Sequence, residues 1–221
     1  MNKTHLPLRT ISVLLIFCIF LFPSCSSDEE DVISPKPRAY FRIELPKKEY
    51  VNYSGDCPFS FEIPKYAQIK VDTDSYAEPC WLFMDFPSFK GRLHLTYKPV
   101  NGNINTFLEQ TYDMTSRHQI KASGIEEMPV SKKEVKVYGL IYNVEGNAAS
   151  STQFFLTDSV HHFIRGALYF FETPNADSAK PVIEFIRKDI QHMIETFKWE
   201  NKIIPAASAK ASKSTSTVIR K

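Results

Sequence analysis

The apolar residues of this chain repeat with a period of two in some stretches and with a helical period in others, which restricts the fold. Alternation at Phe59–Ile63 and Leu93–Tyr97 predicts half-buried strands, and the nearly continuous apolar run Trp81–Phe86 predicts a strand buried on both faces. From Ile104 the apolar positions fall on one helical face, and Gly124 ends this pattern. A helix therefore follows the first strands.

Strand patterns then return, and a second helix follows them. Shorter strands are predicted at 40–45 and 67–71, and later strands at 135–144, 152–157 and 161–171. Gly139 lies inside one of them and indicates a bulge or a close approach of two backbones. The last helix carries an apolar stripe from Val182 to Phe197. The order predicts an α+β fold, an antiparallel or mixed sheet with one mid-chain and one C-terminal helix packed on one side of it.

The start of the chain has the layout of an export signal. Lys3 and Arg9 precede Ile11–Phe22, an apolar run of signal-peptide length that is too short to cross a bilayer comfortably. Ser24 and Cys25 follow in the order of a bacterial lipobox, where the cysteine is acylated, with palmitate among its lipids, and the chain is cut before it. We expect residues 1–24 to be a lipoprotein signal peptide; an ordinary secretory signal or an uncleaved anchor helix is the alternative.

The remaining chain divides into three parts. Residues 25–39 are expected to form an acylated, acidic, Pro-containing tether. Its acidic run resembles the tethers that send some lipoproteins of the Bacteroidetes to the cell surface, and a plain solvated linker is the alternative. Residues 40–200 are expected to form a single domain, and the Ala-, Ser-, Lys- and Thr-rich residues 201–221 a disordered basic tail.

Charge and cysteine usage narrow the function further. The chain has 27 basic and 25 acidic residues. Removal of residues 1–24 takes away Lys3 and Arg9, so the mature chain has equal numbers of basic and acidic residues, which argues against a nucleic-acid partner. Of the four cysteines, Cys18 leaves with the leader and Cys25 is acylated, so Cys57 and Cys80 remain. Two cysteines in an oxidising compartment usually form a disulfide; a redox pair or metal site is less favoured because no Cys-x-x-Cys spacing occurs.

The polar stretch 146–167 raises the question of catalysis. Asp158, Ser159 and His161 are too close together on one turn to form a nucleophilic triad easily, and no Gly-x-Ser-x-Gly elbow occurs. His161 and His162 would point to opposite faces of a strand, so they would not chelate one metal together. The simpler interpretation is that Asp158 and Ser159 satisfy backbone groups of a turn and that one histidine packs inside.

Other candidate ligands and binding residues are isolated. His94, His118 and His192 stand alone on their elements, and no His-Glu-x-x-His motif or glycine-rich phosphate loop is present. We therefore expect no metal and no cofactor. Arg165 is expected either to pair with a buried carboxylate or to act as an exposed binding residue.

Several strings taken together resemble one family, the gliding-motility lipoprotein GldD of the Bacteroidetes. They are residues 35–43, Cys57-Pro58-Phe59, Pro79-Cys80-Trp81, His94–Lys98, Gly146-Asn147-Ala148, Gln153–Ser159, His162–Phe170, residues 174–178 and Phe197-x-Trp199. The resemblance covers about residues 25–199. The order of elements also resembles the Mog1/PsbP-like fold.

The resemblance implies a non-enzymatic component required for gliding, in machinery linked to the type IX secretion system. We expect a lipid-anchored accessory that makes protein–protein contacts in the cell envelope, at the periplasmic or surface leaflet of the outer membrane. Its possible interaction or structural motif consists of Asn147, Gln153, Thr157, Asp158, Ser159, His162 and Arg165. The alternatives are an envelope lipoprotein that binds a small ligand or glycan and, less favoured, a hydrolase using the Asp158–His162 region.

Overall fold

The computed structural model describes residues 43–171 and 176–202. These belong to the second of two units into which the chain divides, residues 1–41 and 42–221. The predicted signal peptide, the acylation site Cys25, the tether and the tail beyond residue 202 lie outside the described residues.

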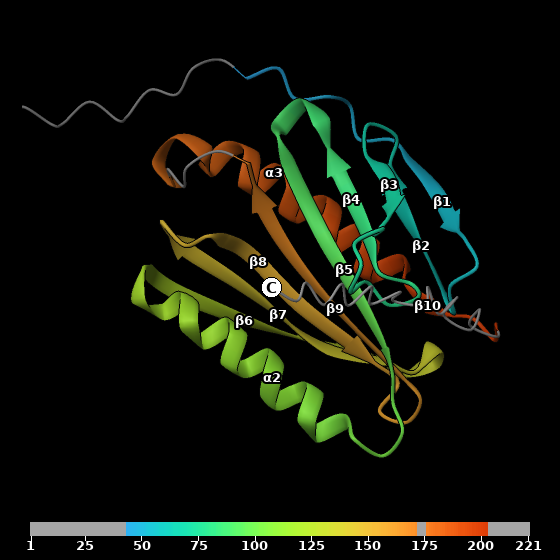
Figure 1. The fold of residues 1–221 in the computed structure, drawn as a ribbon. Coiled ribbons are helices and arrows are strands. Elements are labelled where there is room, and N and C mark those ends of the chain that lie inside the picture. The colour runs from blue at the N-terminus through green and yellow to red at the C-terminus, as the bar shows by residue number, and fades with distance from the viewer. Residues whose placement is uncertain (1–42, 172–175, 203–221) are drawn as a thin grey trace, which may run out of the picture. The chain divides into compact units, whose positions relative to one another are not determined.

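A seven-stranded antiparallel sheet forms the centre of the described unit (Figure 1). Every pair of neighbouring strands is antiparallel. In spatial order the strands are β3 (Gln68–Val71), β4 (Leu82–Phe86), β5 (Gly91–Pro99), β9 (His162–Phe170), β8 (Ser150–Thr157), β7 (Val137–Gly146) and β6 (Ala122–Lys132). A second sheet has the order β1 (Tyr50–Ser54), β2 (Phe59–Pro64) and β10 (Lys198–Trp199).

Two α-helices complete the α+β fold, which confirms the predicted class. They are α2 (Ile104–Ser116) and α3 (Ala176–Thr196); short 3-10 turns occupy Pro87–Phe89, Arg117–Ile120 and Lys133–Val135. The apolar stripe of α3 is confirmed, because Ile186, Ile190 and Met193 are buried in the core with Phe197, which follows the helix.

The two helices cover opposite faces of the large sheet, whereas the sequence had predicted that both pack on one side. Thr115 of α2 contacts the side chain of Gln153, and Arg187 of α3 donates to Thr152 Oγ1 at 3.2 Å. Because successive residues of a strand point to opposite faces, these contacts place α2 and α3 on different sides of β8. Periodicity identifies the buried stripe of each helix but does not specify which face of a sheet receives it.

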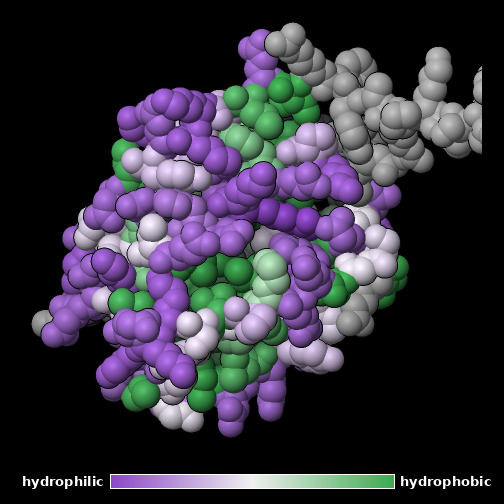
Figure 2. All heavy atoms as spheres, turned by 180° about the vertical axis from the view of Figure 1, so that it is seen from behind, coloured by the Kyte–Doolittle hydropathy of each residue, from purple (hydrophilic) through white to green (hydrophobic). Residues whose placement is uncertain are grey.

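The two faces have different interiors. Between the large sheet, α3 and the small sheet lies the apolar core, which includes Phe59, Phe61, Leu93, Phe154 and Ile186. On the α2 side, the helix buries two threonines, Thr111 and Thr115. The surface seen from behind in Figure 2 is mainly hydrophilic, with a limited hydrophobic area near its centre. Neither α-helix in the described ranges has the length and apolarity needed to cross a membrane.

Three sequence predictions of local structure were wrong in detail. Residues 43–49 have no regular structure, so the described part of the strand predicted at 40–45 is absent and the first described strand begins at Tyr50; residues 40–42 lie outside the described residues. The helix α2 ends at Ser116, well before Gly124. The strand β6 was missed; it is an edge strand whose residues are exposed or half-buried and which contains Pro129, features that weaken a strand pattern.

The predicted disulfide is present between Cys57 and Cys80, with a Cα–Cα distance of 5.5 Å. Cys57 precedes β2 of the small sheet, and Cys80 precedes β4 of the large sheet, so the bond links the two sheets. Both cysteines are buried.

We expect the double substitution Cys57→Ala, Cys80→Ala to lower the free energy of unfolding by about 3 kcal/mol, because it releases a loop closure in the unfolded chain. Urea unfolding of the wild type with and without reductant, compared with the double variant, measures this effect. The variant should be insensitive to reductant. Equal midpoints for all samples would contradict the expectation.

Candidate functional site

The turn between β8 and β9 holds most of the polar motif predicted from the sequence. Asp158 Oδ1 accepts the backbone N–H groups of Val160, His161 and His162 at 2.8–3.0 Å. Thr157 Oγ1 donates to the carbonyl of His162 at 2.6 Å and accepts the N–H of Ser159 at 2.8 Å. These bonds allow Ser159 to adopt its left-handed conformation, with φ of 68°.

The electrostatics of Asp158 fit this role in the turn. Burial by itself would raise the pKa of the Asp158 carboxyl, but the three backbone N–H donors outweigh burial and hold the pKa below its ordinary value. Its other oxygen, Oδ2, lies 3.6 Å from Nδ1 of the exposed His161. The carboxylate is thus engaged mainly in holding the backbone of the turn.

His162 packs inward while His161 is exposed. The Nδ1 atom of His162 lies 2.8 Å from the hydroxyl of Tyr97, and its ring stacks on Trp199 with centroids 4.9 Å apart. Burial lowers the pKa of His162 and raises the pKa of Tyr97 to about 12. At neutral pH both groups are therefore uncharged.

We expect the protein to lose stability as the pH falls from 7.5 to 5.5. Burial also lowers the pKa values of His94 and His118, in addition to that of His162. A histidine with a lowered pKa in the folded state takes up protons more readily when unfolded, so the free energy of unfolding falls with pH through this window.

Thermal unfolding at the two pH values checks this prediction with a matched pair of variants. His162→Gln should lose less stability on acidification than the wild type, whereas His161→Gln, at an exposed neighbour, should lose the same amount. Identical losses in all three proteins would show that burial of His162 does not set the pH dependence.

A second polar group lies beneath α2. Gln153 is fully buried, and its Oε1 accepts a hydrogen bond from Arg165 Nη2 and lies 3.5 Å from Thr115 Oγ1. Thr115 Oγ1 donates to the carbonyl of Thr111 at 2.9 Å, and Thr96 Oγ1 donates to the carbonyl of Arg165 at 3.4 Å. A polar network thus occupies the space between the helix and the sheet.

The charge of Arg165 has no ion-pair partner among the described residues. Arg165 Nε and Gln153 Nε2 are buried and lack hydrogen-bond partners within the same residues. Burial lowers the pKa of the Arg165 guanidinium, while Tyr169 opposes this shift. The sequence had left open a buried carboxylate partner for Arg165. Its side-chain partners among the described residues are instead the neutral amide of Gln153 and the side chain of Tyr169.

A cavity of about 290 Å³ adjoins Arg165. Its lining combines aromatic and polar side chains from α2 and the strands: Trp81, Thr96, Lys98, Phe107, Gln110, Thr111, Met114, Phe163 and Arg165. The ring centroids of Phe107 and Phe163 are 5.4 Å apart, which joins helix to sheet at the cavity wall.

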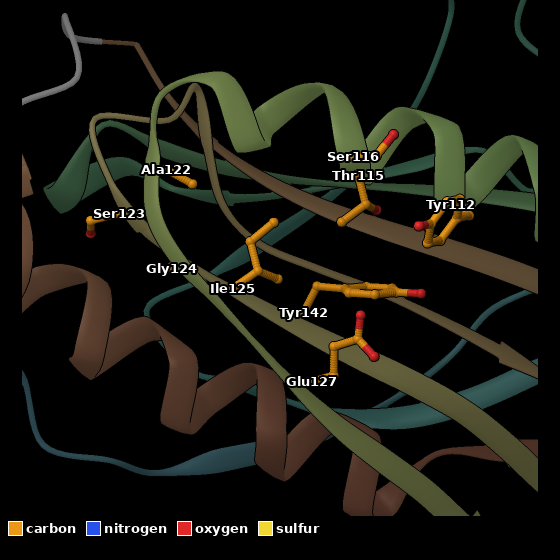
Figure 3. Close-up of a pocket in the computed structure, with 9 residues that line it drawn as sticks. All are labelled: Tyr112, Thr115, Ser116, Ala122, Ser123, Gly124, Ile125, Glu127 and Tyr142. Carbon is orange, nitrogen blue, oxygen red and sulfur yellow. The ribbon is translucent and has the colours of Figure 1, made fainter.

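A second cavity, of about 280 Å³, lies between the C-terminal half of α2 and strands β6 and β7. Figure 3 shows the ring of Tyr142 beneath α2, with Glu127 and Tyr112 nearby. Burial, and then the charge of Glu127, raise the pKa of Tyr142. The lining of this second cavity includes no cationic residue. The helix α2 therefore has a hollow on each side, and one of them is lined by the half-buried, positively charged Arg165.

The structure brings together some of the predicted motif and separates the rest. Thr157, Asp158, Ser159 and His162 share one turn, while Gln153 and Arg165 meet under α2. The exposed Asn147 lies in the turn before β8, at the opposite end of that strand. Sequence analysis did not assign Thr111, Thr115 or Trp81 to a site; threonines in place of large apolar residues on the buried face of α2 were the available signal. No cluster of three or more potential metal ligands occurs among residues 43–171 and 176–202.

Comparison with known proteins gives the family. The profile of the family described as "Gliding motility lipoprotein GldD" matches residues 30–199, which include both sheets, both helices and the Gln153–Arg165 pair. The chain belongs to the GldD family. The strings that suggested this family in the sequence thus lie in a matched segment that covers most of the chain.

Two further comparisons accompany the GldD match. The solution structure of cyanobacterial PsbP (CyanoP) from Synechocystis sp. PCC 6803 is similar over 72% of this chain and 97% of that one, with 10% sequence identity and a TM-score of 0.41. No curated protein matches the chain.

Proposed function

We propose that this GldD-family chain is a lipid-anchored, non-enzymatic accessory of the gliding machinery, which is linked to type IX secretion, and that it acts through protein–protein contacts in the cell envelope. The observation that carries the proposal is the family match over residues 30–199. Anchoring is through lipid on Cys25, at the periplasmic or surface leaflet of the outer membrane.

The geometry of the β8–β9 turn supports a non-enzymatic role. A hydrolytic triad needs a carboxylate that orients the histidine acting as base toward the nucleophile. Asp158 instead directs one oxygen to three backbone N–H groups, and His162 is held by Tyr97 and Trp199. These residues therefore favour the structural interpretation over the hydrolase alternative.

Lipid attachment is tested by metabolic labelling with an alkyne analogue of palmitate, followed by membrane fractionation. The wild type should be labelled and membrane-bound, whereas Cys25→Ala should be unlabelled and released from the membrane fraction. The double variant Cys57→Ala, Cys80→Ala is the matched control. It should keep its label, since it retains Cys25 for the lipid and the two cysteines that it lacks form the disulfide in the wild type. Label on Cys25→Ala would refute this anchor.

A further inference from the structure

The unpaired charge of Arg165 beside a cavity is the most unusual feature of the described residues. Arg165 is half-buried, and its Nε atom is buried without a hydrogen-bond partner among the described residues. A charged group that loses part of its hydration is stabilised by an ion pair and hydrogen bonds that replace the lost water. Gln153 supplies one neutral acceptor to the guanidinium, and the side chain of Tyr169 is its other hydrogen-bond partner. An anion in the cavity would supply the missing charge.

The surrounding charges agree with this inference. The positive charge of Arg165 contributes, after burial, to the lowered pKa of His118. At the rim, Lys98 pairs with Glu78, and its Nζ lies 5.1 Å from the ring centroid of Trp81. The cavity thus has two half-buried cations, Arg165 and Lys98, and the only carboxylate paired with either, among the described residues, is Glu78 on Lys98.

The walls of the cavity indicate the rest of the ligand. Trp81, Phe107 and Phe163 provide flat apolar surfaces, and the volume of about 290 Å³ is near the lower end of ligand-binding cavities. Gln110 and Met114 of α2 are exposed beside the opening. Such a space suits a small molecule rather than an extended polymer.

We propose that the cavity between α2 and strands β5 and β9 binds a small molecule that carries one anionic group, a carboxylate or a phosphate, on a flat apolar body. Arg165 binds the anionic group and is positioned by Gln153; Trp81, Phe107 and Phe163 contact the body. This binding site is separate from the turn at Asp158 and does not depend on the proposed role in gliding.

Ligand-observed fluorine NMR on the full mature chain in lipid nanodiscs tests the proposal. The probes are 4-fluorophenylacetate, 4-fluorophenyl phosphate and the uncharged 4-fluorophenylacetamide, with empty nanodiscs as blank. At least one anionic probe should bind saturably and at least about tenfold more tightly than the amide. The anionic probe that binds more tightly shows whether the site prefers a carboxylate or a phosphate. No saturable binding of either anion, or equal binding of the amide, would overturn the proposal.

Two variants locate the bound probe. Arg165→Met should weaken binding about tenfold or more, whereas Arg117→Met, the same change at an exposed position, should leave it unchanged. Because Arg165→Met also alters the network under α2, Thr111→Leu serves as a second variant that fills the cavity and keeps the charge. Thermal unfolding establishes that each variant is folded. Wild-type affinity in the folded variants would overturn the assignment to this cavity.

Discussion

Asp189→Ala is expected to lower the free energy of unfolding by about 3 kcal/mol. Asp189 on α3 is 1% exposed and accepts hydrogen bonds from Lys48 Nζ at 2.5 Å, from Tyr50 Oη at 2.9 Å and from the hydroxyl of Tyr66. Removal of the carboxylate leaves one ammonium and two hydroxyl groups without their shared acceptor. Urea unfolding followed by tryptophan fluorescence measures the loss.

The exposed ion pair on the same helix provides a matched control. Glu184 lies 3.9 Å from Lys180, with both side chains more than half exposed. Glu184→Ala should change the free energy of unfolding by less than about 0.5 kcal/mol, because water screens exposed pairs. If the two substitutions had equal effects, the buried network would not be the source of the stabilisation.

The Asp189 network also joins the start of the described chain to α3. Lys48 and Tyr50 lie near the start of the described chain, before β2. Both donate hydrogen bonds to Asp189 of α3. Lys48 additionally donates to the carbonyl of Phe185 at 3.0 Å and lies 3.8 Å from the centroid of its ring.

Gly139→Ala is expected to destabilise the fold by about 3 kcal/mol. A Cβ atom at Gly139 would lie 1.9 Å from the backbone oxygen of Phe155 on the neighbouring strand β8 and 3.0 Å from the side chain of Leu156. Backbone in the middle of a sheet has little freedom to move, so the strands must separate locally. Thermal and urea unfolding measure the change.

Gly124→Ala on β6 is the control for this substitution. A Cβ atom there would have no neighbour within 4 Å. The free energy of unfolding of the Gly124→Ala variant should therefore stay within about 0.5 kcal/mol of that of the wild type. Equal stability of Gly139→Ala and Gly124→Ala would contradict the close strand approach.

The sequence predicted a bulge or a close backbone approach at Gly139, because glycine weakens a strand interior and is found there mainly at such places. The structure shows the close approach, to the backbone oxygen of Phe155. The helices and most strands were likewise predictable, because their buried faces repeat with the right period. The strand β6 was not, because a mostly exposed edge strand has no such period. The face on which each helix packs depends on contacts between residues distant in the chain, such as Thr115 with Gln153.

The site was predictable in its residues but not in its grouping. Gln153 and Arg165 stood out in the sequence together with Asp158, yet the structure places Asp158 in a turn and the other two beneath α2, where Arg165 lines a cavity. That cavity also needs Trp81 and Phe107, which come from other elements. Their side chains are ordinary core residues in the sequence pattern, so only the assembled fold reveals a binding surface.

The central claim is that the chain is an anchored accessory of gliding, and its most direct test is a chromosomal deletion scored for colony spreading and for adhesins on the cell surface. We predict that the deletion abolishes spreading, that wild type and Ser159→Ala with His162→Ala restore it, and that Cys25→Ala does not. Unchanged spreading and intact surface adhesins in a gliding host after deletion would contradict the account.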